Sequence, residues 1–173
     1  MPTMEAPSRE LIEITPFKNE PLTDFSREEN ARKMRAAIDK VRSQLGREYD
    51  LVIGGRRLKA TDKIRSMNPA KPSEVVGVFQ KAGVEHVEPA MQAALTAFDS
   101  WKYVSAEERA QLLLRTSKSV RDRKFEFSAW MVFEVSKNWA EADADVAELI
   151  DFLEFYARQA LQLAKADAPL QLK

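Results

Sequence analysis

NWAEADADVAELIDFLEFYARQALQLAK, residues 138–165, is the longest uninterrupted helical pattern in this chain and contains neither glycine nor proline. Apolar side chains recur in it at spacings of three and four, which places them along one side of a helix. These side chains are Ala142, Val146, Leu149, Ile150, Leu153, Ala157, Ala160 and Ala164. Acidic residues crowd the first turns, where the helix dipole favours negative charge. The stretch therefore predicts a long amphipathic helix around which the other elements pack.

The opposite side of this predicted helix is not simply polar. At about 100° per residue, Phe152 and Phe155 fall within roughly 40° of Glu148. Partial burial of a carboxylate between two rings costs free energy unless a cation compensates. An ammonium group would suit this position, because the carboxylate and the negative faces of the rings both attract it. Glu148 is therefore either a solvated carboxylate on an acidic helix face or a ligand for a cation.

Composition narrows the class of protein. The chain has 173 residues, is 45% hydrophobic, and balances 27 Lys and Arg against 27 Asp and Glu. Bulk charge thus favours neither nucleic acid nor an anionic membrane as a partner. No apolar run approaches the roughly 20 residues that span a bilayer, and the acidic N-terminus is unlike a signal peptide. We expect a soluble cytoplasmic protein.

The remaining segments predict an α+β fold. Residues 1–22 hold four of the eight prolines and are expected to form an extended arm. Residues 23–173 are expected to form a single partial domain. Ser26-Arg27-Glu28-Glu29 is a capping-box pattern that predicts a helix over 26–45, followed by Gly46 at its C-terminal end.

Short β-type segments fill residues 50–80. Leu51–Ile53 and Arg56–Leu58 flank a Gly54-Gly55 turn, and two further segments follow at 63–67 and 75–79. We predict a small antiparallel β-meander, which must pack against helices because so few short strands are not stable alone.

Residues 84–165 are predicted to be helical. A first helix over 85–103 places Met91, Ala94, Leu95 and Phe98 on its expected buried side. A second capping box, Ser105-Ala106-Glu107-Glu108, opens the next helix, and 125–135 forms a third before the long final helix.

The usual catalytic signatures are absent. The five glycines form neither GxGxxG nor a P-loop, and without cysteine there is no thiolate nucleophile or thiolate metal site. The single histidine, His86, is expected to be exposed and has no neighbours for a metal site or a triad. The run 121–124, RDRK, is interpreted as a solvated helix end, and Trp101, Trp130 and Trp139 as packing residues. We therefore assign no catalytic, cofactor-binding or metal-binding residue in this chain.

Several motifs carry a resemblance to a known family. They are Phe17-Lys18-Asn19-Glu20-Pro21, Thr23-Asp24-Phe25, Leu51-Val52-Ile53-Gly54-Gly55, Asn68-Pro69-Ala70, Glu74-Val75-Val76-Gly77, Arg123-Lys124, Phe127, Glu134-Val135-Ser136-Lys137-Asn138-Trp139, Glu141-Ala142-Asp143-Ala144-Asp145, Ile150-Asp151-Phe152 and Tyr156-Ala157-Arg158. Over about residues 16–163 the chain resembles the N-terminal part of the aldehyde dehydrogenase superfamily. The tightest resemblance is to its L-glutamate γ-semialdehyde (1-pyrroline-5-carboxylate) dehydrogenase branch.

The resemblance implies an activity. In that branch NAD oxidises glutamate γ-semialdehyde to glutamate in proline breakdown, through a cysteine thiolate, hydride transfer and a glutamate-activated water. The family glutamate that matches Glu148 lies near the amino group of the substrate. The resemblance thus implies a substrate-binding role for Glu148 in the complete enzyme.

The resemblance also shows what this chain lacks. The family's catalytic cysteine, general-base glutamate, oxyanion-stabilising asparagine and glycine-rich NAD segment have no counterpart here, and Glu134 does not replace the missing base. Ser136 stands where members commonly carry glycine.

The chain thus resembles the front portion of a larger enzyme that works as a homo-oligomer. Its dinucleotide-binding domain would be incomplete, and the fragment would be inactive without its remainder. The alternative is a stand-alone helical interaction module derived from such an enzyme. Under the fragment interpretation we expect large apolar side chains, Phe152 and Phe155 among them, to be unusually exposed.

Overall fold

The computed structural model describes residues 11–165, which form five α-helices, one short 3₁₀-helix and five short strands. In chain order these are α1 (Glu28–Arg42), β1 (Arg47–Tyr49), β2 (Leu51–Ile53), β3 (Arg56–Leu58), β4 (Lys63–Met67), β5 (Val75–Gln80), η1 (Val84–His86), α2 (Val87–Trp101), α3 (Ala106–Asp122), α4 (Lys124–Val135) and α5 (Trp139–Lys165). The mixture of helices with small separate sheets agrees with the expected α+β class. Within residues 11–165, no helix is both long and apolar enough to cross a membrane.

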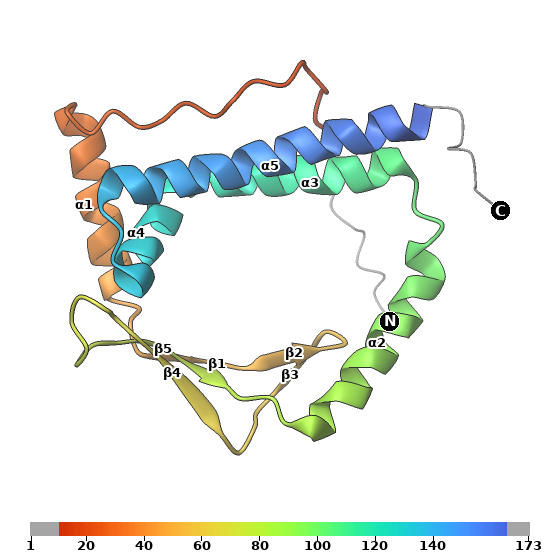
Figure 1. The fold of residues 1–173 in the computed structure, drawn as a ribbon, viewed down its shortest axis with the longest axis horizontal. Coiled ribbons are helices and arrows are strands. Elements are labelled where there is room, and N and C mark those ends of the chain that lie inside the picture. Colours follow the sequence, from red (N-terminus) through yellow and green to blue (C-terminus); the bar gives the residue numbers. More distant parts are fainter. Residues whose placement is uncertain (1–10, 166–173) are drawn as a thin grey trace, which may run out of the picture.

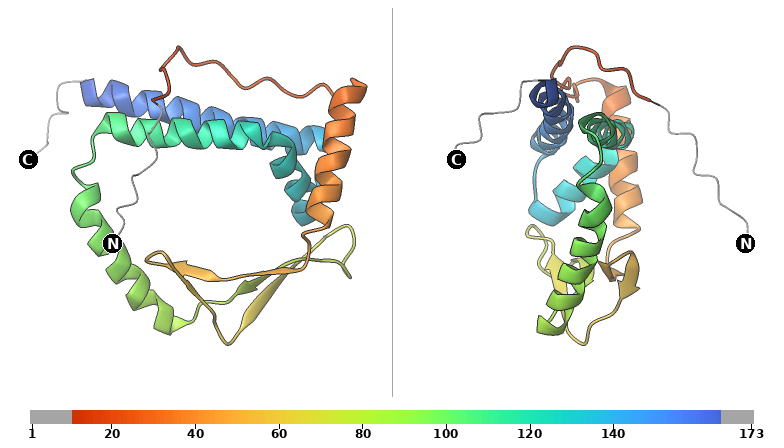
Figure 2. Two further views of the ribbon diagram at one scale, coloured as in Figure 1. Left: turned by 180° about the vertical axis from the view of Figure 1, so that it is seen from behind. Right: turned by 90° about the vertical axis from the view of Figure 1, so that its right-hand side faces the viewer.

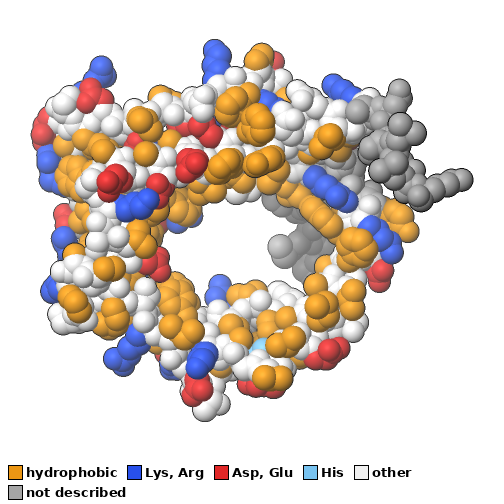
Figure 3. Space-filling model, in the orientation of Figure 1, with side chains coloured by type: hydrophobic (Ala, Val, Ile, Leu, Met, Phe, Trp, Pro, Cys, Tyr) orange, Lys and Arg blue, Asp and Glu red, His pale blue; other side chains and the backbone are white. Residues whose placement is uncertain are grey.

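The elements are arranged as a ring (Figure 1). Helices α3 and α5 lie side by side along one edge, and α1 and α4 stand at one end. The strands form the opposite edge, and α2 closes the other end by connecting β5 to α3. The two views in Figure 2 show that the ring is thin when seen edge-on. Figure 3 shows an opening through its middle, bordered by many hydrophobic side chains.

Within residues 11–165 the buried core is divided into three small clusters. One joins α1, β5 and α4 and contains Met34, Ala37, Val41, Val76, Ala129 and Phe133. Two others lie mainly between α3 and α5, around Ala110, Leu114 and Ala157 and around Val120, Val146 and Ile150. Small alanines at these positions let α3 and α5 approach closely. The buried side of α5 thus includes Ala142, Val146, Ile150 and Ala157 of the predicted apolar side. The prediction is wrong for Leu149 and Ala164, which are exposed.

The predicted single antiparallel meander is wrong in its pairing. Strands β2 and β3 form a separate hairpin, while β1, β5 and β4 form a mixed sheet in the order β1-β5-β4. Strand β5 pairs with β4 antiparallel and with β1 parallel. Two residues after the hairpin, the Ala60 amide donates to the Gln80 side chain of β5 at 2.9 Å. Strand β1 was missed because all three of its residues are exposed, so it lacks the alternation that marks a strand.

Helix α2 departs furthest from expectation. None of its residues is buried, and Met91, Leu95 and Phe98 are 55%, 53% and 55% exposed. Periodicity identified the apolar side correctly, but no other part of the described chain covers it. His86, just before α2, is not exposed as expected: its side chain is 15% exposed and its Nδ1 accepts from the Gly83 amide at 3.1 Å.

The two predicted capping boxes have different outcomes. Ser105 accepts from the Glu108 amide at 3.1 Å and forms the box that opens α3. The Ser26 box does not form, because the Ser26 hydroxyl donates to Asp24 at 2.6 Å and α1 begins after Arg27.

The part of the predicted arm that the structure describes has neither helix nor strand. It runs alongside α5 before entering α1 (Figure 1). Residues 1–10 lie outside the described residues, so the arm and domain boundaries stay a prediction.

Ser136, at the C-terminal end of α4, has φ 57° and ψ 31° and is the one non-glycine residue with positive φ in the described chain. A left-handed conformation costs a residue with a Cβ about 1–2 kcal/mol. We expect Ser136→Gly to raise the free energy of unfolding by about 1 kcal/mol, less a small entropic loss. Urea unfolding measures this. Ser119→Gly, on an exposed position inside α3, is the control and should destabilise by about 1 kcal/mol; the same sign for both variants would contradict the explanation.

The ion pairs of Glu126 in α4 should make the stability of the fold depend on pH in the acid range. Its carboxylate lies 3.0 Å from Arg123 and 2.8 Å from Lys40, and these partners lower the pKa of Glu126 from 4.5 to about 2. A lowered pKa stabilises the fold above the unfolded pKa, and this contribution is lost as pH falls from about 4.5 towards 2. Both cations are half exposed, so water screens their interaction with Glu126. We therefore expect Glu126 to contribute about 1 kcal/mol to the free energy of unfolding at neutral pH.

Measuring urea midpoints between neutral and acid pH tests this. Glu126→Gln should be less stable than the parent at neutral pH and equal to it near pH 2. Glu13→Gln changes an exposed glutamate of the arm and should track the parent throughout. A constant difference for Glu126→Gln at every pH would contradict the assignment.

Candidate functional site

A groove of about 500 Å³ lies between α4 and α5, around Glu148. Its lining residues are Phe127, Trp130, Met131, Glu134, Asp145, Val146, Glu148, Leu149 and Phe152. Residues three or four apart share one side of a helix, which is why Phe127, Trp130 and Met131 of α4 form one wall. Glu148, Leu149 and Phe152 form the facing wall on α5 by the same spacing.

The groove contains only half of the predicted aromatic pair. Phe152 is 50% exposed and lines the groove with Glu148, whose side chain is also exposed. Phe155 is 39% exposed but does not line it. Its ring packs edge-on against Phe17 of the arm, with centroids 5.6 Å apart. The expectation that both rings are unusually exposed is confirmed, whereas the expectation that both flank Glu148 is not.

The lining charges are all negative in the described part of the chain. Asp145 forms an ion pair with Lys137, and Glu134 accepts from the Ser66 hydroxyl at 3.3 Å. Glu148 has neither a hydrogen bond nor an ion pair within residues 11–165. An unpaired carboxylate beside aromatic rings is suited to an organic cation. The groove therefore offers chemistry suited to binding a cation.

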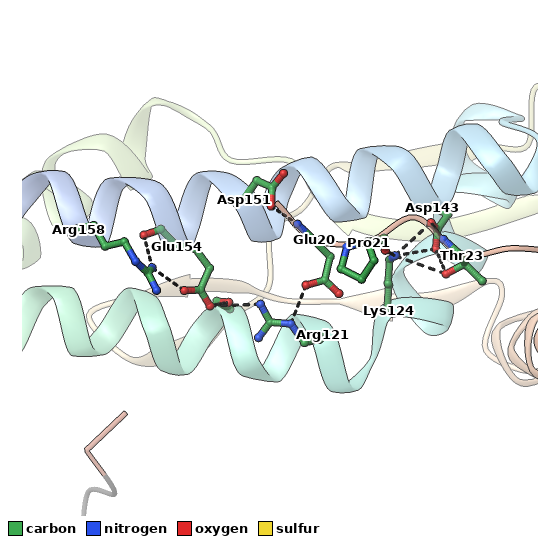
Figure 4. A network of polar contacts seen from close by, with 10 residues as sticks. Glu20, Pro21, Thr23, Arg121, Lys124, Asp143, Asp151, Glu154 and Arg158 are labelled. Carbon is green, nitrogen blue, oxygen red and sulfur yellow. Dashed lines mark hydrogen bonds and ion pairs between the residues drawn. The ribbon is translucent and has the colours of Figure 1, made fainter. Parts of the chain in front are cut away.

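A buried polar network on another side of α5 fixes this helix (Figure 4). Lys124 and Asp143 are 9% and 2% exposed, and their charged groups lie 3.1 Å apart. Lys124 also donates to the Pro21 carbonyl at 2.9 Å, and Thr23 donates to Asp143 through its amide at 2.8 Å and its hydroxyl at 2.6 Å. The interpretation of the run 121–124 as a solvated helix end is therefore wrong for Lys124.

Sequence reasoning missed this network for an identifiable reason. Asp143 precedes Val146 and Ala147 by three and four residues, so it lies on the buried side of α5. That placement signals that a buried carboxylate needs a partner. Its partners, Lys124 and Thr23, are distant in sequence, and periodicity does not identify them.

A second polar cluster surrounds Glu154. Burial alone would raise the pKa of Glu154, but hydrogen bonds from Ser117, Arg158 and Arg121 outweigh it and hold this pKa below its usual value. Arg121 also pairs with Glu20 of the arm at 2.8 Å. The cluster therefore ties α3, α5 and the arm together (Figure 4).

Comparison with known proteins identifies the family to which this chain belongs. The sequence model of the Aldehyde dehydrogenase family matches residues 57–172. This chain belongs to the aldehyde dehydrogenase family. The match includes α2 to α5, and therefore both walls of the groove.

The curated relatives refine the resemblance. The chain is 54% identical over 151 residues to 1-pyrroline-5-carboxylate dehydrogenase of Bacillus pumilus, covering 87% of this chain and 29% of that protein. It is 52% identical over 151 residues to 1-pyrroline-5-carboxylate dehydrogenase 2 of Bacillus subtilis, with the same coverage. The chain therefore spans about three tenths of the length of these relatives.

Solved structures agree with the fold. A mutant form of 1-pyrroline-5-carboxylate dehydrogenase from Thermus thermophilus superposes with a TM-score of 0.85 at 46% identity, covering 92% of this chain and 32% of that one. A 1-pyrroline-5-carboxylate dehydrogenase from Thermus with bound NAD gives the same values. These findings confirm the predicted resemblance to the N-terminal part of such enzymes and the predicted fold class.

Removing one partner of a buried ion pair leaves the other charge uncompensated, which typically costs about 3–5 kcal/mol. We therefore expect Asp143→Ala to lower the free energy of unfolding by about 3 kcal/mol. The matched control is Asp145→Ala on the same helix, whose pair with Lys137 is one-third exposed and should contribute below about 1 kcal/mol. Urea unfolding of both variants measures the difference, and equal losses would rule out a special role for the buried pair.

Proposed function

We propose that this chain is the N-terminal part of an NAD-dependent L-glutamate γ-semialdehyde dehydrogenase. The complete enzyme oxidises glutamate γ-semialdehyde, formed from 1-pyrroline-5-carboxylate by ring opening, to glutamate in proline breakdown. Support comes from relatives at 54% and 52% identity that are named for 1-pyrroline-5-carboxylate. In this proposal Glu148 binds the amino group of the substrate.

The observation that carries the role of Glu148 is its lack of an internal partner. On α5, Asp143 and Asp145 each pair with a lysine. Asp151 accepts hydrogen bonds from the arm, and Glu154 accepts them from arginines. Within the described residues Glu141 and Glu148 have no such donor. Glu141 lies in the first turn, where the helix dipole favours a carboxylate. Glu148 lies mid-helix without that stabilisation, which supports a ligand from outside the chain.

The glycines of this chain do not form a cradle for NAD. Gly54 and Gly55 turn the β2–β3 hairpin with φ 57° and 76°, and Gly46, with φ 76°, follows α1. Gly77 lies in β5, where a Cβ would meet the Phe79 ring at 3.0 Å. No glycine-rich turn joins a strand directly to a helix N-terminus in residues 11–165, as a pyrophosphate site requires. In the proposal, NAD and the catalytic residues belong to the rest of the longer enzyme.

The uncovered apolar surface supports the same proposal. The exposed side of α2 and the border of the central opening (Figure 3) carry large hydrophobic side chains. Many large hydrophobic side chains left exposed in this way are typical of a surface covered in the assembled protein. We propose that the remainder of the enzyme covers it, and that the complete protein forms homo-oligomers.

The same surface would serve the alternative, a stand-alone helical interaction module. Purified chain that is monodisperse and melts cooperatively favours this alternative. Aggregation, or retained helix without cooperative melting, favours the fragment.

The proposed function is tested by restoring the missing part. The 173-residue chain alone should form no NADH from glutamate γ-semialdehyde and NAD. Residues 1–165 joined to the remainder of the Bacillus pumilus relative should form it. NADH formation by the chain alone, or none by the joined protein when it folds, would contradict the proposal.

In the joined enzyme, Glu148→Gln should raise KM for glutamate γ-semialdehyde about tenfold and change kcat little. A hydrogen bond to a charged group contributes about 1.5–3 kcal/mol, and about 1.4 kcal/mol corresponds to tenfold. Glutaric semialdehyde, which lacks the amino group, should be oxidised with unchanged KM. Glu141→Gln, elsewhere on α5, is the control and should change neither KM. An equal effect of Glu148→Gln on both substrates would exclude the proposed contact.

A further inference from the structure

Five residues at the junction of the arm and the domain, Asn19–Thr23, form an arm segment that is fixed to α5 on both sides of Glu148. The Asn19 amide group donates to Asp151 at 2.7 Å, and the Glu20 backbone amide donates to the other oxygen of Asp151 at 2.6 Å. At the other end, Thr23 donates twice to Asp143. Glu148 lies between these two aspartates in the sequence of α5. The arm therefore braces the segment of helix that carries Glu148 (Figure 4).

The lengths of the two segments match. Asp151 follows Asp143 by eight residue positions of α-helix, a rise of about 12 Å. Thr23 follows Glu20 by three residue positions of extended chain, which span about 10 Å. The arm thus runs antiparallel to α5 with little slack. A shift or rotation of this helical segment would break hydrogen bonds at one end or the other.

The same arm residues also hold the opposite wall of the groove. Lys124, the first residue of α4, donates to the Pro21 carbonyl at 2.9 Å and pairs with Asp143 at 3.1 Å. Arg121, at the end of α3, pairs with Glu20 at 2.8 Å. The arm is therefore bonded to the start of α4 and to α5. These are the two helices between which the groove lies.

We infer that the arm segment Asn19–Thr23 is a positioning element for Glu148, and that Asp151 is the positioning residue through which it acts. This inference rests on the proposed function, because it concerns how tightly the groove binds the substrate ammonium group. Asp151 lies one turn from Glu148, at the i+3 position, and does not line the groove. Its carboxylate acts on the substrate only by fixing α5.

A purely structural role gives a different result from a positioning role. Loss of stability lowers activity on every substrate alike. Displacement of Glu148 instead weakens binding of the amino group and spares a substrate without one. The ratio of the two KM values therefore separates the roles.

The test uses the joined enzyme with glutamate γ-semialdehyde and glutaric semialdehyde. Asp151→Ala should raise KM for the amino substrate about fivefold, with kcat and the KM of glutaric semialdehyde within about twofold, because less than one full charged hydrogen bond is lost at the ligand. Asn19→Ala removes one donor from the exposed arm and should give a smaller change of the same kind. Asp122→Ala, which removes an exposed carboxylate that pairs with Lys118 on α3, is the matched control and should change neither KM.

Combination with Glu148→Gln completes the test. Because Asp151 acts through Glu148, Asp151→Ala should change KM by less than about twofold in the Glu148→Gln background. Additive effects would overturn the inference, as would equal losses on both substrates. If Glu148→Gln is selective for the amino substrate but Asp151→Ala and Asn19→Ala are not, the inference fails and the proposed function stands. If Glu148→Gln is not selective, the proposed contact fails and the inference fails with it.

Discussion

The buried ion pair between Lys124 and Asp143 is the constraint on which the other contacts depend. Burying either charge alone would be strongly unfavourable, so each fixes the position of the other. The pair joins the first residue of α4 to the second turn of α5, and both partners also bind the arm. Three segments that are distant in sequence must therefore come together before either charge is satisfied. The position of α5 relative to α4 follows from this requirement.

Such polar contacts matter here because the apolar core is small and divided. Its three clusters hold α1 to α4 and α3 to α5, and none of them includes α2. A ring with uncovered apolar surface buries less area per residue than a closed domain, and less burial means less stabilisation. Specific hydrogen bonds then determine how the elements lie relative to one another. The carboxylates of Asp143, Asp151 and Glu154 on α5 accept several of them.

The sequence predicted what local pattern determines and missed what distant contacts determine. The length of α5, the Ser105 capping box and the exposure of Phe152 follow from spacing and residue type within a few turns. The parallel pairing of β1 with β5 and the burial of Lys124 depend on partners far away in the chain. Helix α2 shows this limit of local pattern most clearly, because periodicity identifies the apolar side of the helix but not what covers that side. The candidate site was half predicted for the same reason: Glu148 and Phe152 share a groove, but the arm draws Phe155 away to Phe17.

Helix α5 combines structure and the proposed recognition because its sides are separated by angle. At about 100° per residue, Glu148 lies roughly 140° from Asp143 and roughly 60° from Asp151 around the helix axis. The carboxylates that face the arm have donors within the chain, so they are fixed and largely neutralised. Glu148 lines the groove and has no hydrogen-bond or ion-pair partner for its side chain within residues 11–165. Moving Glu148 one position towards the N-terminus would turn it by about 100° to the place of Ala147, which is buried. An unpaired carboxylate in this groove therefore requires both the register of α5 and the arm that holds it.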